Sequence, residues 1–451
     1  MKTIHALLLM CLLTAVEAAA VEAPQPCQPV DENKALGLPD VVELALCGNP
    51  QTRQVWASAR YQEAQVAIAR AAYLPNVSGS ASASRTWSDR AGTVSPLDSK
   101  SVGLSLSYLL FDFGGRSATL ENARQLLAAA VATQDSTVQS LFLSAVQAFY
   151  QVQAAEATLA SAKEAERSSQ ESLKAATLRF SVGSGAPADK LQAQTAYSQA
   201  SYNRIQAEGA LRTAQGNLAN VLGWDADHAV NLLAASSIEL PMDFERNVAD
   251  LIAQARQRRP DLAAAQAQVN AARANVDVAR AADLPTLNFG ATATNSRSDV
   301  LTAGNAYALS LSLNVPLYSG GAASNRIYAA EAQVESSQAQ RDKLQHQIAL
   351  DVWNAYQNLQ SASQSLRSSA DLVNSAEQAE RVASARYQAG LGSLLDVLVA
   401  QSNLASARQQ RVQSSYNWNI YRATLAQAMG MLDAGLLGAG TVAQPKEKSL
   451  P

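Results

Sequence analysis

The chain has 451 residues and a formal net charge of −3, with acidic and basic residues interspersed along its length. Hydrophobic residues make up 48% of the sequence but aromatic residues only 6%, and much of the apolar content is Ala. The even mixture of charges argues against a nucleic-acid-binding surface. A chain so rich in small apolar side chains is suited to packing helices closely together rather than to building a thick globular core.

The first 20 residues have the three parts of a secretory signal peptide: Met1–Lys2, the apolar segment Ala6–Val16 and the small-residue run Ala18–Ala20. We expect cleavage after Ala20, with Ala18 as the alternative. A membrane anchor is the other interpretation, but the apolar segment is too short to span a bilayer. After residue 20, no stretch approaches the roughly 18 apolar residues of a transmembrane helix.

Two cysteines, Cys27 and Cys47, remain once the signal peptide has removed Cys11. In an oxidising compartment they are a candidate disulfide that ties an extended leader, residues 21–39, to the first helix. Closing a loop of about 20 residues would stabilise the fold by roughly 3 kcal/mol if chain entropy alone decides. The alternative is that Cys47 is a small buried apolar residue of that helix.

Two segments without Gly or Pro, over 116–181 and 322–389, predict helices of unusual length. The first would reach roughly 100 Å, whereas an average helix has about 11–12 residues. Its small and apolar residues recur at alternating three- and four-residue steps, which is typical of coiled-coil packing. This seam consists of Val138, Leu141, Ala145, Ala148, Val152, Ala155, Leu159 and Ala162. A second seam of Phe142, Val146 and Phe149 predicts packing partners on two sides.

The chain contains two copies of one pattern, residues 40–223 and 248–430, joined by a mixed segment over 224–247. Each copy has a helix, a β-hairpin, a long helix and a further helix. The predicted ranges are 40–73, 76–110, 116–181 and 188–222 in the first copy, and the last three are 286–315, 322–389 and 393–429 in the second. The tail over 431–451 is predicted to be disordered.

Gly and Pro residues mark the same boundaries in the same order in both copies, which Ala-rich composition alone does not produce. The predicted helix–strand transitions are Pro75, Gly114 and Gly115 in the first copy and Pro285, Pro316, Gly320 and Gly321 in the second. The predicted helical hairpin tips are Gly183, Gly185 and Pro187, and Gly390 and Gly392. We therefore infer an internal duplication.

Within the hairpins, small polar side chains alternate with apolar ones, as in strands over 76–86 and 102–110 that flank a predicted polar loop over 87–100. Strands of about 9–11 residues suit a tilted crossing of a membrane, with one face towards lipid and the other towards a lumen. Phe111, Phe113 and Tyr318 would form an aromatic girdle. The alternative, the edge of a soluble sandwich, suits four strands among helices poorly.

Four strands per chain cannot close a barrel, and lipid does not tolerate open sheet edges. The barrel is therefore predicted to be shared between subunits. Two chains would give eight strands, which side chains nearly fill, whereas three would give twelve and leave an aqueous bore. If the two shorter helices of each copy stack end to end, each chain supplies four helical rods and a trimer twelve. The predicted fold is thus a mixed α and membrane β fold, a trimeric 12-stranded barrel continued by a long α-helical coiled-coil barrel.

Several motifs support a family assignment, and their order and duplication extend over about residues 38–432. They are Leu74–Pro75, Leu110–Gly114, Pro316–Gly321, Asp396–Leu398 and two Arg-aromatic-x-x-Gly hairpins over 179–183 and 386–390. With these motifs the sequence resembles the TolC family of outer-membrane channel proteins. The resemblance implies a homotrimer in the outer membrane of a Gram-negative cell, with its helical barrel in the periplasm.

The resemblance also implies a function, the exit duct of a tripartite export system. Its partners would be a periplasmic adaptor (membrane fusion) protein, an inner-membrane ABC or RND transporter and outer-membrane lipid. The lack of a lipidation motif and the Cys27–Cys47 leader favour type I protein secretion, with multidrug efflux as the alternative. A periplasmic structural coiled-coil or adaptor protein is an alternative of a different class.

The resemblance places a periplasmic gate or constriction at the helical hairpins. By position, Asp189 and Tyr387 match the family's polar gate contacts, and Asp396 matches an aspartate-ring position. Gly392 and Val399 depart from the pattern, because some relatives have a gate arginine and a second ring aspartate there. The alternative for Asp189 and Asp396 is a helix-capping role, because each lies in a first helical turn.

Enzyme activity finds no support in the sequence. His5 belongs to the signal peptide, and His228 and His346 lack neighbours at metal-ligand spacing. There is no nucleophile elbow and no phosphate-binding loop. We therefore predict no catalytic residue, no metal and no cofactor.

Overall fold

The computed structural model describes residues 35–90, 93–228, 230–233, 247–299 and 303–432. Outside these ranges lie the predicted signal peptide, most of the leader, most of the connecting segment and most of the predicted tail. Cys47 is disulfide-bonded. Its predicted partner, Cys27, lies outside the described residues, so this pairing stays a prediction.

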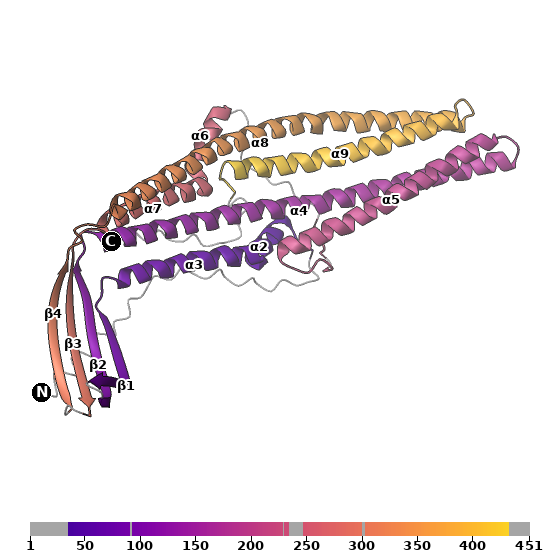
Figure 1. Cartoon of the computed structure of the whole chain (residues 1–451). Coiled ribbons are helices and arrows are strands. Elements are labelled where there is room, and N and C mark those ends of the chain that lie inside the picture. Colours follow the sequence, from indigo (N-terminus) through magenta and orange to yellow (C-terminus); the bar gives the residue numbers. More distant parts are fainter. Residues whose placement is uncertain (1–34, 91–92, 229, 234–246, 300–302, 433–451) are drawn as a thin grey trace. The chain divides into compact units, whose positions relative to one another are not determined.

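The described elements repeat the order helix, helix, strand, strand, helix, helix. The first set is α2 (Leu38–Gly48), α3 (Pro50–Ala71), β1 (Asn76–Arg90), β2 (Thr93–Phe111), α4 (Gly115–Ser181) and α5 (Pro187–Leu222). The second set is α6 (Val248–Arg258), α7 (Pro260–Ala281), β3 (Thr286–Ser298), β4 (Gly304–Asn314), α8 (Ala322–Gln388) and α9 (Leu394–Ala428). The long helices α4 and α8 have 67 residues each (Figure 1). None of the described helices is both long and apolar enough to cross a membrane.

The chain divides into two compact units. Among the described residues, the first unit contains 56–133 and 261–343, and the second contains 35–55, 134–260 and 344–432. The beginnings of α4 and α8 belong to the first unit and their remainders to the second.

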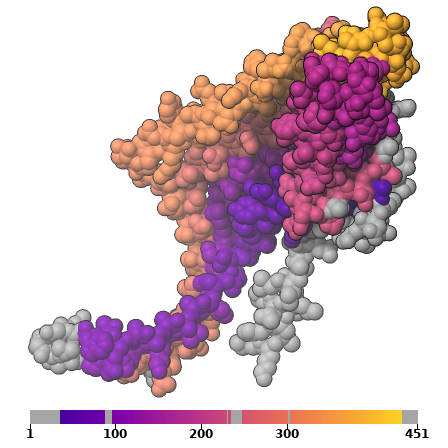
Figure 2. Space-filling view, turned by 90° about the vertical axis from the view of Figure 1, so that its right-hand side faces the viewer, coloured from indigo at the N-terminus to yellow at the C-terminus, as the bar shows by residue number. Residues whose placement is uncertain are grey.

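The first unit contains a four-stranded antiparallel sheet in the order β1-β2-β3-β4, so β1 and β4 are its edges. No described helix packs across either face of this sheet. In Figure 2 the sheet is coloured purple and orange. One face, called here the apolar face, carries Val77, Val102, Leu104, Leu106, Tyr108, Phe289, Tyr307, Leu309, Leu311 and Leu313. Its side chains are largely exposed, with Tyr307 and Leu309 each at 79%.

The opposite side of the sheet is lined by hydroxyl groups and is called here the hydroxyl face. It carries Ser78, Ser80, Ser82, Ser84, Ser101, Ser105, Ser107, Thr292, Thr294, Ser310 and Ser312. Hydroxyls pair across β1 and β2, as in the 2.7 Å Oγ–Oγ contact between Ser78 and Ser105. The period of two therefore separates apolar from polar side chains, as the sequence predicted.

The predicted polar loop over 87–100 is wrong, because the strands continue through it. β1 extends to Arg90 and β2 begins at Thr93. Trp87 remains opposite Pro96 in the ladder. The two strands are held together here by backbone hydrogen bonds, which form whatever the side chains are. Because neither face packs on apolar atoms, the strands need no alternating apolar residues, and a polar composition therefore does not indicate a loop.

The helices of the first unit pack through small side chains supplemented by polar contacts. Val66 and Ala69 of α3 and Ala123 of α4 form a buried cluster. The Asn122 side-chain amide of α4 donates a 2.7 Å hydrogen bond to the carbonyl oxygen of Ala271 in α7. Because a side-chain amide pairs here with a backbone carbonyl, neighbouring helices are tied at a defined register.

The predicted transition residues all lie where helices and strands meet. Pro75 precedes β1, Pro285 precedes β3 and Pro316 follows β4. Gly114 precedes α4, whose first residue is Gly115, and Gly320 and Gly321 precede α8. Gly114, Gly320 and Gly321 have φ angles of 93°, 63° and 82°. These left-handed conformations are readily available to Gly, so the chain can reverse direction there.

A clamp between Asp112 and Arg116 fixes the start of α4. The Asp112 Oδ2 atom accepts a 2.7 Å hydrogen bond from the backbone N–H of Arg116, and the two side chains form a 3.4 Å ion pair. The Arg116 Nη1 atom donates to the carbonyl oxygen of Leu109 at 2.7 Å. The last residues of β2 are thus tied to the first turn of α4.

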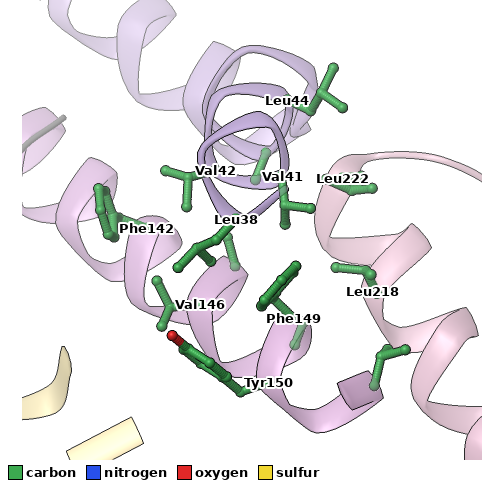
Figure 3. Close-up of a cluster of buried hydrophobic side chains, with 14 of the residues drawn as sticks. Leu38, Val41, Val42, Leu44, Phe142, Val146, Phe149, Tyr150, Leu218 and Leu222 are labelled. Atoms are coloured by element: carbon green, nitrogen blue, oxygen red, sulfur yellow. The ribbon is translucent and has the colours of Figure 1, made fainter. Parts of the chain in front are cut away.

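The second unit has a core formed by α2, α4, α5 and α9. Phe142, Val146 and Phe149 of α4 are nearly fully buried, and Phe149 lies between α2 and α5 (Figure 3). Leu141 and Val152, from the other predicted seam, are also buried. Both seams of α4 therefore have packing partners at this level.

Two backbone segments of this unit meet at glycines. Gly223, which ends α5, has a φ of 80°, and a Cβ atom on it would lie 2.6 Å from the carbonyl oxygen of Gly48. A Cβ on Gly48 would likewise lie 2.6 Å from the carbonyl oxygen of Leu222. The second repeat has the same arrangement, because a Cβ on Gly430 would lie 3.0 Å from the backbone of Arg258.

Replacing Gly48 with Ala is expected to destabilise the second unit by about 1–3 kcal/mol, because rigid backbone atoms must separate to admit the methyl group. The measurement is the thermal unfolding midpoint of the purified protein in detergent. Gly209→Ala is the control, because nothing lies within 4 Å of its added Cβ atom. In a helix interior that change should stabilise by about 0.5–1 kcal/mol. Equal midpoints for the two variants would contradict the close contact.

Candidate functional site at the helical hairpins

The two long helices end in the same turn. After α4, Gly183 has a φ of 77°, and the N–H of Ser184 donates to the carbonyl oxygen of Arg179 at 2.9 Å. After α8, Gly390 has a φ of 73°, and the N–H of Leu391 donates to the carbonyl oxygen of Arg386 at 2.8 Å. A left-handed Gly followed by such a bond is the Schellman helix end.

The second glycine of each hairpin lies against the preceding helix. A Cβ atom on Gly185 would lie 3.1 Å from the Cβ of Arg179, and one on Gly392 would lie 3.2 Å from the Cβ of Arg386. A side chain at Gly392 would therefore require the end of α8 to give way by a few tenths of an ångström. After the first hairpin, Pro187 occupies the first position of α5, where its missing N–H costs nothing.

Arg179 joins the two hairpins of one chain. Its Nη2 atom donates a 3.0 Å hydrogen bond to the carbonyl oxygen of Tyr387, and its guanidinium carbon lies 4.1 Å from the centre of the Tyr387 ring. Beside this contact, Ala176, Ala193 and Leu394 form a small buried cluster. Tyr387 packs against that cluster, so a cation–π contact and an apolar contact act on the same ring.

Arg179 was not among the residues predicted for the site. It precedes the aromatic residue of the first hairpin, as Arg386 precedes Tyr387 in the second. That repeated pair was visible in the sequence, but the stacking partner of Arg179 lies in the other repeat. Only the tertiary packing of the two helical hairpins brings the two residues together.

Asp189 lies in the first turn of α5 and is partly exposed. Within the part of the chain that the structure describes, no hydrogen bond joins its carboxylate to the hydroxyl of Tyr387. A carboxylate in this position also complements the positive end of the helix dipole. The gate role of Asp189 and Tyr387 therefore stays a prediction.

Asp396 takes part in the cap of α9. The Ser393 hydroxyl accepts a 3.2 Å hydrogen bond from the N–H of Asp396, and the Asp396 carboxylate accepts one of the same length from the N–H of Ser393. Hydrogen bonding of the Asp396 carboxylate to the side chain and backbone of Ser393, and then the charge of Arg386, lower the pKa of Asp396. Its carboxylate is exposed, so the capping contact leaves room for a role at a constriction. Val399 is exposed as well, at 51%.

If Asp396 forms a constriction, Asp396→Ala should raise single-channel conductance and reduce block by multivalent cations. The wild-type block should persist as the pH falls to about 4, since the lowered pKa keeps the carboxylate charged at the ordinary value of 3.8. The block by cations and the stabilisation of α9 by the capping carboxylate are both fully present above the ordinary pKa. Both are lost as the pH falls through the lowered pKa of Asp396. The measurement is conductance in planar bilayers against pH. Asp371→Ala, a change at an exposed aspartate within α8, is the control, and equal traces for both variants would contradict the constriction.

Farther from the hairpin turns, a polar groove of about 850 Å³ lies between the α4–α5 pair and the α8–α9 pair. Each pair has its own ion pair, Glu166–Arg204 at 2.8 Å between α4 and α5, and Glu377–Arg408 at 3.1 Å between α8 and α9. Across the groove, the Gln401 amide donates to the Ser168 hydroxyl at 2.8 Å. Each pair is thus tied internally, whereas few polar contacts join one pair to the other.

The described residues contain no group of three His, Cys, Asp or Glu side chains that could hold a metal ion. The main features of the described structure are long helices, a sheet with one apolar and one hydroxyl face, and two matched helical hairpins. A sequence profile described as outer membrane efflux protein matches residues 41–224 and 251–431. The chain belongs to the outer membrane efflux protein family.

Individual relatives agree with this assignment. Protein CyaE of Bordetella pertussis is 35% identical over 94% of this chain and 89% of its own length. The proteases secretion protein PrtF of Dickeya chrysanthemi is 26% identical over 85% of this chain and 86% of its own length. The crystal structure of the Campylobacter jejuni CmeC outer membrane channel has a TM-score of 0.81 at 19% identity, with 93% of each chain covered.

Membership in the outer membrane efflux protein family confirms the predicted resemblance and the fold class. The protein is an outer-membrane channel protein of a Gram-negative cell that extends into the periplasm, and it is not an enzyme. The alternative of a periplasmic structural coiled-coil protein is thereby overturned. The family works in export systems together with partner proteins.

Proposed function

We propose that three copies of this chain close one twelve-stranded barrel and form the exit duct of a tripartite export system. The observation that carries this proposal is the open sheet, in which β1 and β4 have free edges and the apolar face is exposed. In lipid, each unpaired backbone group costs several kcal/mol, so the edges must pair with other subunits. The hydroxyl face then lines a water-filled lumen.

Three copies suit the side chains better than two. The interior of an eight-stranded barrel is nearly filled by side chains, whereas twelve strands leave an aqueous bore. The hydroxyl face supports a wet lumen, because its serines and threonines hydrogen-bond to water. Apolar side chains would be expected there if the interior were packed.

For the cargo, we propose a protein exported by type I secretion, delivered by an inner-membrane ABC transporter through a periplasmic adaptor protein. The similarity to PrtF, a proteases secretion protein, supports this choice. Multidrug efflux with an RND transporter is the second candidate, supported by the description of the family. The lumen-facing strand residues carry small hydroxyls, so we expect the transporter and adaptor to select the cargo.

Two experiments test this proposal. The mature protein, purified in detergent, should have the mass of a trimer by light scattering and conduct ions in planar bilayers. A monomer that needs no detergent would contradict the channel.

In the native cell, deletion of the gene should abolish export of a secreted protein and leave drug resistance unchanged. Loss of drug resistance with intact protein secretion would favour the efflux candidate.

A further inference from the structure

Two basic side chains lie directly opposite each other just beyond the apolar face. Lys100 of β2 is the register partner of Arg297 of β3. Both belong to the same side of the sheet as Val102, and both are exposed. Like charges on directly opposed strand residues destabilise a sheet. An anion that binds both would remove this repulsion.

The described carboxylates nearest to this pair already have partners. Asp98 forms a 3.3 Å ion pair with Arg85, and the Asp299 carboxylate accepts a 3.1 Å hydrogen bond from the N–H of Asp98. No ion pair of Lys100 or Arg297 occurs among the described side chains. Among the described side chains on this side of the sheet, the cations Arg85, Lys100 and Arg297 outnumber the carboxylates of Asp98 and Asp299.

The position of the pair is defined along the strand. From Tyr108 to Val102, the apolar face of β2 spans about 20 Å at about 3.4 Å per residue, which fits within the roughly 25 Å apolar band of outer-membrane barrels. The connection to α4 leaves the sheet at the Leu110 end. Lys100 and Arg297 therefore lie at the opposite end, one strand period beyond the apolar band.

We propose that Lys100 and Arg297 bind the phosphate groups of lipopolysaccharide in the outer leaflet. The inference rests on the proposed function, in which the apolar face contacts lipid and the β-hairpins face outwards. A cation at this level meets the headgroup layer, where phosphates are concentrated, and two adjacent cations can engage them together. The apolar side chains next to the pair would contact the acyl chains of the same lipid.

The test uses the full mature protein in detergent and three probes: lipopolysaccharide of the shortest sugar chain, its dephosphorylated form, and phosphatidylglycerol. Binding is followed by native mass spectrometry and by the rise in thermal midpoint. Lys100→Gln with Arg297→Gln should weaken lipopolysaccharide binding roughly 30-fold, about fivefold for each cation lost. The dephosphorylated form should bind the wild type as weakly as lipopolysaccharide binds this variant. Phosphatidylglycerol, with one phosphate, should bind more weakly than lipopolysaccharide.

The matched control is Arg167→Gln with Lys174→Gln, which removes one Arg and one Lys from exposed ion pairs on α4. It should bind like the wild type. The charge-preserving swap Lys100→Arg with Arg297→Lys should also retain binding. Equal affinity of the glutamine variant and the control, or of the phosphorylated and dephosphorylated probes, would overturn the proposal. Tighter binding of phosphatidylglycerol would also overturn it.

Conductance separates this inference from the proposed function. The glutamine variant should remain a trimer and conduct as the wild type does, with only lipid binding reduced. Trimers that conduct normally but show no phosphate-dependent binding would contradict the lipid site and leave the channel intact. Absence of trimers and conductance in the wild type would instead contradict the proposed function.

Discussion

Leu309→Arg is expected to abolish assembly in the outer membrane. Leu309 is 79% exposed near the middle of the apolar side of β4, where it pairs with Ala291 of β3. An Arg on the lipid side near the bilayer centre costs about 2–4 kcal/mol. A trimer contains three such residues, so the total approaches the roughly 5–15 kcal/mol by which a folded protein is stable. The measurement is the amount of trimer recovered in purified outer membranes.

The neighbouring residue provides the control for this prediction. Ala308 belongs to the opposite, hydroxyl side of the same strand, so Ala308→Arg places the same charge towards the proposed lumen. This variant should assemble normally and shift ion selectivity towards anions in planar bilayers. If Ala308→Arg were lost from the membrane and Leu309→Arg were tolerated, the assignment of the two faces would be reversed.

Arg179→Ala is expected to loosen the hairpin end of the duct and raise single-channel conductance several-fold. The change removes a cation–π contact, worth about 0.5–2 kcal/mol, and a charged hydrogen bond to Tyr387, worth about 1.5–3 kcal/mol. Because few other polar contacts join the helical pairs, we expect the two hairpins to separate more readily. The measurements are conductance in planar bilayers and the sensitivity of cells to large antibiotics that otherwise stay outside.

Two further variants decide which group at this site carries the effect. Lys190→Ala removes a cation 5.5 Å from the Phe180 ring within a single hairpin, so it should conduct like the wild type. Tyr387→Phe keeps the ring and the carbonyl oxygen that Arg179 contacts, so it should also stay closed. Opening by Tyr387→Phe, with no effect of Arg179→Ala, would instead assign the closure to the tyrosine hydroxyl.

Much of the helical architecture could be predicted because its limits are local. Pro75 and Gly114 end or begin elements through their own backbone geometry, and the alternation of apolar and hydroxyl residues follows from the strand period of two. The strand segments over 87–100 were missed because they are not defined by local signals. Their pairing depends on the partner strand, and their composition contains no apolar alternation that would reveal it.

The hairpin site divides in the same way. Gly183 and Gly390 were recognisable as turn residues because a left-handed helix end favours Gly. The capping role of Asp396 was also foreseeable from its place in a first helical turn. The contact between Arg179 and Tyr387 was not, because those residues lie in different repeats and no local rule relates them.

By itself, the sequence determined the turns that Gly and Pro mark and which side chains share a face, since both depend on backbone preferences within a few residues. The tertiary structure alone decided which distant residues meet. It placed Lys100 opposite Arg297 through strand register, and Arg179 on Tyr387 through helix packing. The physical reason is that register and packing are set by many weak contacts acting together, and no single residue records their sum.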